Sequence, residues 1–239
     1  MTISIAHRGD PIRFRENTIE AFKSAISLGA DMIELDVKPS RDGKAVILHD
    51  DTLDRLWNIP HRVRDLSYTE IQGLCDSDKW QIPLFEDVLR TIKQPIMVDF
   101  TDLDTVDCIV ETIRRMEAAH RCLIVTGNTD ALREVRRQML HATLGLTWND
   151  SRLPSDELIE ELDVAYFNPD WRLLRDPAEN RIGFSGGQRT VDFFHQRGIR
   201  VSCWTVDDKD DMDFVYGLGV DAITTNDTKT LMEVLNSEG

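Results

Sequence analysis

Short apolar segments alternate with helix-period segments along almost the entire chain. The apolar segments have the length of single strands, and the segments between them repeat their apolar residues with the period of a helix. Strands that alternate with helices in this way are typical of βα units built around a parallel sheet. The chain has 239 residues, which is long enough for a complete βα barrel. We therefore predict an α/β fold, a (β/α)8 TIM barrel, formed by residues 1–239 as a single domain.

The candidate strands outnumber the eight places of such a barrel by one. At least one candidate is therefore wrong or lies outside the ring, and the weakest patterns are those of 142–147 and 164–168. The nine candidate strands are 3–7, 32–37, 45–49, 96–100, 122–126, 142–147, 164–168, 200–205 and 221–225. Candidate helices between them are 17–28, 105–117, 130–140, 155–162, 190–197, 209–217 and 228–236.

The connection between the second and third candidate strands, KPSRDGK, has no helical pattern. Its Asp42-Gly43 pair is a turn signal and favours an ordinary hairpin. A hairpin is expected to place His49 at the end of the sheet opposite to Asp36. Alternatively, seven extended residues reach about 23 Å and could run back along the strand, which would bring both residues to the same end. On spacing alone, the hairpin is favoured.

The composition of the chain favours a small-molecule substrate. The formal charge is −15, and such a surface repels both nucleic acid and anionic membranes. No apolar segment resembles a membrane span, and the first residues enter a candidate strand without a signal-peptide pattern, so we expect a cytoplasmic protein with no stable membrane insertion. The four cysteines are widely spaced without a CxxC motif, which indicates neither a zinc site nor a disulfide framework.

Ionisable residues recur where the first four candidate strands finish. In a parallel barrel the active site is built at the carboxyl ends of the strands, so this recurrence is typical of a catalytic rim. Each residue taken alone also has an ordinary structural interpretation, such as a hydrogen-bonded histidine or an aspartate that caps a loop. The residues concerned are His7, Arg8, Glu34, Asp36, His49, Asp50 and Asp99.

Two of these acids, Glu34 and Asp36, lie two residues apart within the buried-looking segment GADMIELDV. Side chains two apart on a strand point to the same face. Like charges at such a distance destabilise one another unless one is protonated or a cation lies between them. Together with Asp99 they offer three carboxylates, a donor set that suits Mg²⁺ or Ca²⁺ better than zinc. We predict one divalent cation at this place.

Residues 5–55 contain the motifs HRG, ENT, ELDV, DG and HD in that order. In sequence and spacing this segment closely resembles the glycerophosphodiester phosphodiesterase family, TIM-barrel phosphodiesterases similar to phosphatidylinositol-specific phospholipase C. The segments IPLFEDVL at 82–89, CWTVDD at 203–208 and GVDAITTND at 219–227 extend the resemblance. Residues 102–198 match only in their βα rhythm.

The resemblance implies a barrel with a small insertion after the third strand and an enzyme of lipid and glycerol metabolism. Its implied reaction is the metal-dependent hydrolysis of glycerophosphodiesters to glycerol 3-phosphate and an alcohol, through attack by a neighbouring glycerol hydroxyl. The implied roles are general acid and base for His7 and His49, metal ligation for Glu34 and Asp36, and substrate binding for Arg8, Glu16 and Trp204. Glu16 would lie near the metal or orient Arg8.

The sequence departs from the family pattern on the fourth strand. Most members have Glu-x-Lys there, whereas MVDFTD places Asp99 as the third metal ligand and Thr101 in the position of the lysine. Either another basic residue such as Arg55 or Arg172 supplies the missing charge, or activity is reduced, or the substrate differs. Alternative functions are therefore a phosphodiesterase acting on lysophospholipids or other phosphodiesters, and a catalytically weakened barrel that binds phosphodiesters.

Two long segments are candidate covers of the site. Residues 54–67 form a basic and aromatic patch that could act as a lid over an anionic substrate, or could be an exposed loop with internal salt bridges. Residues 168–188 are long for a βα loop and are a second candidate. The residues of the patch are Arg55, Trp57, His61, Arg62 and Arg64.

Overall fold

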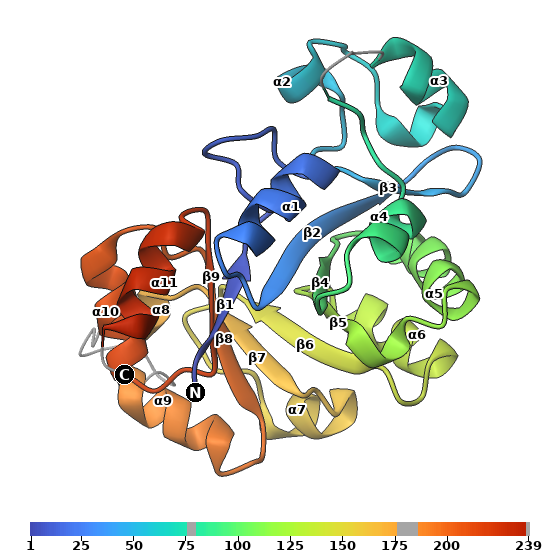
Figure 1. Ribbon diagram of the computed structural model, residues 1–239. Coiled ribbons are helices and arrows are strands. Elements are labelled where there is room, and N and C mark those ends of the chain that lie inside the picture. Colours follow the sequence, from blue (N-terminus) through green and yellow to red (C-terminus); the bar gives the residue numbers. More distant parts are fainter. Residues whose placement is uncertain (76–79, 176–185, 238–239) are drawn as a thin grey trace.

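Eight parallel strands close into a barrel in the computed structural model, which describes residues 1–75, 80–175 and 186–237 (Figure 1). The ring closes because the first strand pairs with both the second and the last. The prediction of a (β/α)8 TIM barrel is confirmed. In ring order the strands are β1 (Ile3–Ala6), β2 (Met32–Pro39), β4 (Ile96–Asp99), β5 (Cys122–Thr126), β6 (Thr143–Trp148), β7 (Tyr166–Pro169), β8 (Arg200–Cys203) and β9 (Ala222–Thr225).

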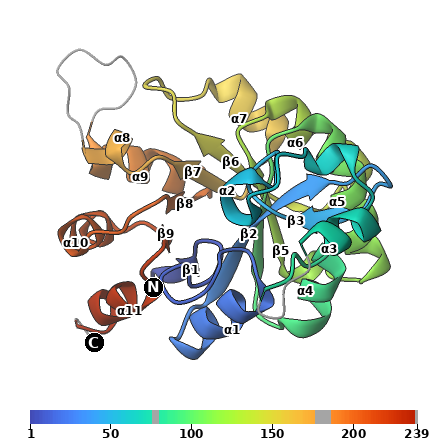
Figure 2. The ribbon, with the colours of Figure 1, turned by 90° about the horizontal axis from the view of Figure 1, so that it is seen from above.

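Helices surround the ring on its outside, as the view along the barrel shows (Figure 2). The first of them begins where the sequence indicates, because Thr18 accepts a hydrogen bond from the backbone N–H of Ala21 and caps the helix. These helices are α1 (Ile19–Ser27), α4 (Phe85–Thr91), α5 (Val106–Arg115), α6 (Thr129–Gln138), α7 (Asp156–Leu162), α8 (Arg172–Arg175), α9 (Gly187–His195), α10 (Lys209–Gly217) and α11 (Thr228–Asn236). The short 3-10 helices η2 (Leu103–Thr105) and η3 (Ala119–Arg121) precede α5 and β5.

The strand outside the ring is β3 (Ala45–Ile47), which pairs with β2 in antiparallel orientation. The hairpin prediction is therefore confirmed. The ranking of the weak candidates was wrong, because 142–147 and 164–168 correspond to the ring strands β6 and β7. An apolar pattern indicates that a segment is extended and buried, but it does not indicate which strand the segment pairs with.

The predicted consequence of the hairpin for His49 was also wrong. Within the ring β2 pairs with β4 up to Asp36, but β2 continues to Pro39, beyond the last pair with β4. The hairpin uses this extension, and the backbone N–H of Leu48 donates to the carbonyl of Asp36. The returning chain consequently brings His49 back to the carboxyl end of the barrel, where Asp36 lies.

The ring strands bury apolar side chains on both faces. Alternate residues of β2 such as Ile33 and Leu35 pack outward against the helices, in the same core cluster as Phe22 of α1. The intervening positions point inward, where Met32 of β2 and Met97 of β4 belong to a separate cluster inside the barrel. Above this inner layer the inward positions become acidic, so the apolar packing forms the floor of the site.

A small insertion follows β3 and has its own apolar cluster (Figure 1, cyan to teal). It contains α2 (Asp54–Trp57), the 3-10 helix η1 (Val63–Asp65) and α3 (Tyr68–Leu74). Of the other candidate cover, residues 168–188, positions 176–185 lie outside the described residues. Among the helices that the structure describes, none has both the length and the apolar character needed to cross a membrane.

Candidate active site

Strand register brings distant residues together at the carboxyl end of the barrel. Ala6 at the end of β1 is in register with Ile33 of β2 and with Thr225 of β9. The next residue, His7, therefore lies between Glu34 on one side and Asn226 on the other. Asp36 is likewise the direct register partner of Asp99 on β4. Sequence patterns alone cannot supply these pairs, because register depends on how the ring closes.

A cavity of about 360 Å³ opens at this end of the barrel. Most of the predicted site residues line it, namely His7, Arg8, Asp36, His49, Asp99 and Trp204. The indole N–H of Trp204 donates to the backbone carbonyl of Asn168 at 2.9 Å, which fixes the ring at the cavity wall. Glu34 lies buried behind these residues, and Glu16 contacts the cavity through Arg8.

Glu34, Asp36 and Asp99 form a carboxylate cluster whose candidate ligand oxygens all lie within 4.8 Å of one another. Burial, together with the charges of Asp36 and Asp99, holds the pKa of Glu34 well above its ordinary value. Burial, and then the charge of Asp36, raises the pKa of Asp99 to about 8. A cluster of three carboxyl groups offers only oxygen donors, and such a donor set fits a hard divalent cation. It is the one such group among the residues that the structure describes.

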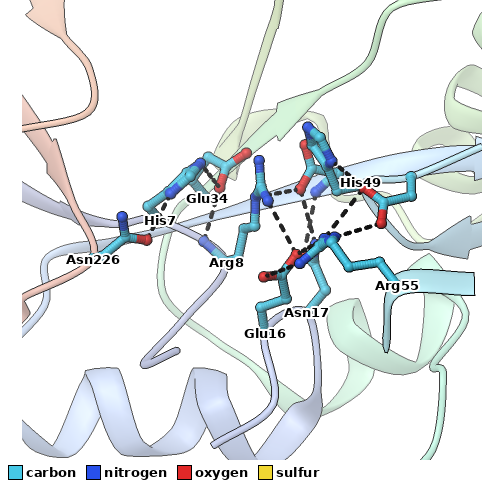
Figure 3. A network of polar contacts seen from close by, with 10 residues as sticks. His7, Arg8, Glu16, Asn17, Glu34, His49, Arg55 and Asn226 are labelled. Carbon is cyan, nitrogen blue, oxygen red and sulfur yellow. Dashed lines mark hydrogen bonds and ion pairs between the residues drawn. The ribbon is translucent and has the colours of Figure 1, made fainter. Parts of the chain in front are cut away.

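Arg8 ties the cluster to the chain that follows β1 (Figure 3). Its backbone N–H donates to Glu34 at 2.8 Å, its Nε lies 3.0 Å from Asp36, and its Nη1 donates to Glu16 at 3.0 Å. The backbone of Arg8 adopts φ 56°, a left-handed conformation that is costly for a residue with a Cβ. A strained residue held by three acids is typical of a functional site.

His7 is held in one tautomer by a chain of two further side chains. Asn226 must donate its amide N–H to Asp207, at 2.9 Å, because a carboxylate can only accept. Its amide oxygen therefore faces His7 and accepts from Nδ1 at 2.8 Å. The unprotonated Nε2 consequently points toward Glu34, at 4.0 Å. Burial, and then the charge of Arg8, lowers the pKa of His7, so the ring is neutral near pH 7.

His49 lies on the side of Arg8 opposite to His7, and its side chain is more exposed than that of His7 (Figure 3). Its Nδ1 is 2.7 Å from Asp50, which also accepts from Nε of Arg55 at 2.6 Å. The guanidinium of Arg55 then reaches Glu16, at 2.6 Å. Burial raises the pKa of Glu16, but the hydrogen bond from Arg55 and the charge of Arg8 outweigh it and lower the pKa overall. This network links the insertion to Arg8.

The chain that carries these two histidines, the arginine and the three acids matches a known protein family. The model of the glycerophosphoryl diester phosphodiesterase family matches residues 7–230. The chain belongs to this family. The predicted resemblance is thereby confirmed, as is the prediction that the chain is an enzyme of the phosphodiesterase class.

Individual relatives agree with the family assignment. A glycerophosphodiester phosphodiesterase of Caldanaerobacter subterraneus is 29% identical and aligns over 100% of this chain and 99% of its own length. The crystal structure of the glycerophosphodiester phosphodiesterase of Thermotoga maritima has a TM-score of 0.84 at 22% identity, covering 98% of both chains. A phosphodiesterase of Oleispira antarctica, solved with the product sn-glycerol 3-phosphate, has a TM-score of 0.82 at 21% identity and covers 99% of this chain and 98% of its own.

The position of Thr101, where the family resemblance implies a lysine, has a lysine beside it. The ammonium of Lys38, from the extension of β2, donates to the Thr101 hydroxyl at 3.0 Å. Arg55 and Arg172, the two residues suggested from the sequence to replace the missing lysine charge, lie in surroundings different from those of Lys38. Arg55 is paired with Glu16 and Asp50, whereas Arg172 is 66% exposed, pairs with Asp170 and does not line the cavity.

Sequence reasoning missed several residues that this family member uses to build the site. Asn17 lies in the ENT motif at the start of the candidate helix 17–28 and was given no role in the site, yet its amide donates to Asp36 at 2.8 Å and its φ is 60°. The quoted segments CWTVDD and GVDAITTND contain Asp207 and Asn226, and their positions at strand ends were the available signal. Lys38 follows Asp36 by two residues and shares its strand face, which was the signal in that case.

A larger cavity, of about 790 Å³, lies at the opposite end of the barrel beside the amino ends of β6, β7 and β8. Arg136 at this cavity donates to the backbone carbonyls of Leu140, Ala142 and Asp163, and so joins the chain segments that precede β6 and β7. Conserved chemistry in parallel barrels is built at the carboxyl ends of strands. The smaller cavity at that end is therefore the candidate active site.

Proposed function

We propose that this chain hydrolyses glycerophosphodiesters to glycerol 3-phosphate and an alcohol, with one divalent cation as cofactor. The observation that carries the proposal is the position of His7, Arg8 and His49 around one cavity whose inner wall is a carboxylate cluster. The Oleispira relative with bound sn-glycerol 3-phosphate supports the same substrate class. The catalytically weakened alternative is disfavoured because both histidines, Asp36 and Asp99 line the cavity and Glu34 lies directly behind them.

The cation would be held by Glu34, Asp36 and Asp99, as the fit of the donor set supports. When bound, a divalent cation supplies positive charge to the non-bridging phosphate oxygens and so lowers the barrier to phosphoryl transfer. Arg8 adds a planar donor fork beside it, and its contacts with Asp36 and Glu16 keep this fork in one orientation.

The two histidines would move the protons of the reaction. Neutral His7 takes the proton of the glycerol hydroxyl next to the phosphoester through Nε2, while the hydroxyl oxygen bonds to phosphorus. The bond between phosphorus and the alcohol oxygen breaks, and His49 donates the proton that this oxygen requires. A cyclic phosphate and a free alcohol result. Water then opens the ring with the roles of the histidines reversed, which yields glycerol 3-phosphate.

The substrate is expected to carry a polar alcohol such as choline or ethanolamine. Apart from Val37, Phe100 and Trp204, the cavity is lined by polar groups and backbone, so its walls offer little to an acyl chain. Lysophospholipids are the contrasting substrates. Faster turnover of a lysophospholipid than of glycerophosphocholine would overturn this assignment of the substrate.

The proposal is tested by changing the histidines. His7→Ala and His49→Ala should each lower the rate of glycerol 3-phosphate release by about 10²–10⁴-fold, the usual contribution of a general acid or base. Metal affinity, measured by calorimetry, should stay near that of the unaltered protein because neither ring belongs to the carboxylate cluster. The control is His120→Ala, an exposed histidine on η3 that should leave both quantities unchanged. Undiminished release by either active-site variant would contradict the proposed roles.

A further inference from the structure

We infer that Lys38 is a second phosphate-binding cation of the active site, acting beside Arg8 on the anionic group of the substrate. The inference rests on the proposed function and deepens it. Lys38 belongs to the part of β2 that extends beyond the last pair with β4, on the same strand face as Asp36.

The burial of Lys38 calls for a functional explanation. Its side chain is only 10% exposed, whereas lysine is among the residues least often buried. Burial of an ammonium costs several kcal/mol unless partners compensate for the lost water. The cavity that contains His7, Asp36 and His49 is also lined by Lys38. The chain therefore holds a second cation within the space that receives the substrate.

The partners of Lys38 hold its ammonium at the rim of the cavity. Nζ lies 3.0 Å from the Thr101 hydroxyl, 2.8 Å from Asp51 and 3.6 Å from Asp102. Both acids are on the solvent side, with side chains 55% and 42% exposed. The hydrogen bond from Lys38 lowers the pKa of Asp51. Exposed acids are well screened by water, so they hold the ammonium in place without cancelling its effect inside the cavity.

The charge balance of the cavity indicates what Lys38 contributes to substrate binding. The three carboxylates of the cluster carry as much negative charge as a divalent cation and Arg8 together can neutralise. Glu16 and Asp50 add two negative charges, of which only one is balanced by Arg55, because Arg8 is already counted against the cluster. Without Lys38, the five acids therefore exceed the cation, Arg8 and Arg55 by one negative charge, which would repel a phosphodiester anion. Lys38 supplies the positive charge that removes this excess.

A competing explanation is that Lys38 only tethers the loops that follow β3 and β4. A tether acts through Asp51 and Asp102, so removing an acid would then have the same effect as removing the lysine. A phosphate-binding cation acts through its charge toward the cavity, and removing Asp51 would leave that charge in place. Lys38→Met and Asp51→Asn are therefore a matched pair of variants, and Lys38→Arg retains the charge.

The test measures binding of sn-glycerol 3-phosphate by calorimetry in the presence of Mg²⁺, and separately the kcat/KM for glycerophosphocholine. We expect Lys38→Met to weaken binding and lower kcat/KM by roughly 10- to 100-fold, the usual effect of a lost charged hydrogen bond. Asp51→Asn is expected to stay within about threefold of the unaltered protein, because exposed pairs contribute little. Lys38→Arg should retain most of the affinity, and the affinity of Lys38→Met should depend less on salt concentration.

Equal losses in Lys38→Met and Asp51→Asn, or affinity unchanged in Lys38→Met, would overturn the inference while leaving the proposed reaction intact. Lysine-dependent binding of glycerol 3-phosphate by a protein that releases none from any glycerophosphodiester would support the inference and overturn the proposed reaction. Thermal unfolding of each variant identifies one that fails to fold. If Lys38→Met fails to fold, the binding of glycerol 3-phosphate by Lys38→Arg and by Asp51→Asn is compared instead. Weaker binding by both variants would indicate a tether, and unchanged binding by both would support a phosphate-binding charge.

Discussion

His7 shows how single residues of this site depend on partners far away in the chain. Its tautomer is set by Asn226, whose orientation is set by Asp207. The backbone N–H of Asn226 also donates to Asp207, at 2.8 Å, so the Asp207 carboxylate binds both the backbone and the side-chain amide of Asn226. The consequence is a neutral imidazole with its free nitrogen directed into the site.

Exchanging these two partners, Asp207→Asn together with Asn226→Asp, should change the pH dependence of catalysis. Asn at 207 can donate to Asp at 226 and still accept from the backbone, so the hydrogen bonds persist while a carboxylate now faces His7. A carboxylate favours the charged ring and raises the pKa of His7, which must be neutral to act as base. The acidic limb of the profile of kcat/KM should therefore move up by about 1–3 pH units.

The control for this exchange is Asp207→Asn alone, which frees the Asn226 amide to rotate. It should lower kcat without moving the acidic limb upward, since no charge has been placed beside the ring. An acidic limb that stays in place in the double variant would contradict the assignment of His7 as the base.

Among the elements, the pairing of β2 with β4 brings together carboxyl groups whose repulsion the proposed cation would relieve. Asp99 has a pKa of about 8 in the folded chain against an ordinary 3.8. Because this pKa is raised, the stability linked to the protonated acid is fully present below about pH 4 and is lost as the pH rises to 8. The metal-free protein should therefore be less stable at pH 8 than at pH 5.

Asp99→Asn should stabilise the metal-free protein at pH 8 and weaken its binding of Mg²⁺ or Ca²⁺. The substitution removes one of three mutually repelling acids, and each kcal/mol of repulsion removed should raise the Tm by about 2–4 °C for a chain of this size. At pH 5 the gain should be smaller. A lower Tm of the variant at both pH values, without metal, would contradict repulsion within the cluster.

The contact of the β1–α1 turn with helix α1 explains the glycine of the HRG motif. Gly9 has φ +87°, and a Cβ there would lie 2.6 Å from the carbonyl carbon of Ala21. Gly9→Ala should therefore destabilise the fold by at least about 2 kcal/mol, from overpacking and from left-handed backbone. Gly43→Ala is the matched control, since Gly43 also has positive φ but no atom within 4 Å, and should cost only about 1 kcal/mol. Denaturant unfolding measures both values, and equal losses would contradict the steric explanation.

Sequence patterns predicted the barrel and most of the site for a simple reason. Period-two burial and the rule of carboxyl strand ends apply to each strand separately, so Glu34, Asp36 and Asp99 could be found without knowing the ring. Asn226 and Lys38 could not be assigned roles, because their significance depends on strand register and on the extension of β2 past the barrel. The single domain over 1–239, the cytoplasmic location and the individual catalytic roles stay predictions.

The whole molecule combines an overall negative charge with positive side chains at the candidate site. A protein with a net charge of −15 repels anions over most of its surface. A phosphodiester is attracted where positive charges gather, and the candidate site brings Arg8 and Lys38 together with the carboxylate cluster proposed to hold a cation. Under the proposed function, the phosphodiester binds at this end of the barrel.

The decisive measurement is the release of glycerol 3-phosphate from glycerophosphocholine and glycerophosphoethanolamine by EDTA-treated protein, before and after Mg²⁺ or Ca²⁺ is returned. Glu34→Gln is assayed beside the unaltered protein, with metal binding followed by calorimetry. We expect no release in EDTA, release restored by at least one of the two cations, and joint loss of metal binding and release in Glu34→Gln. Full release in EDTA, or no release by folded protein that has bound a cation, would contradict a metal-dependent glycerophosphodiesterase.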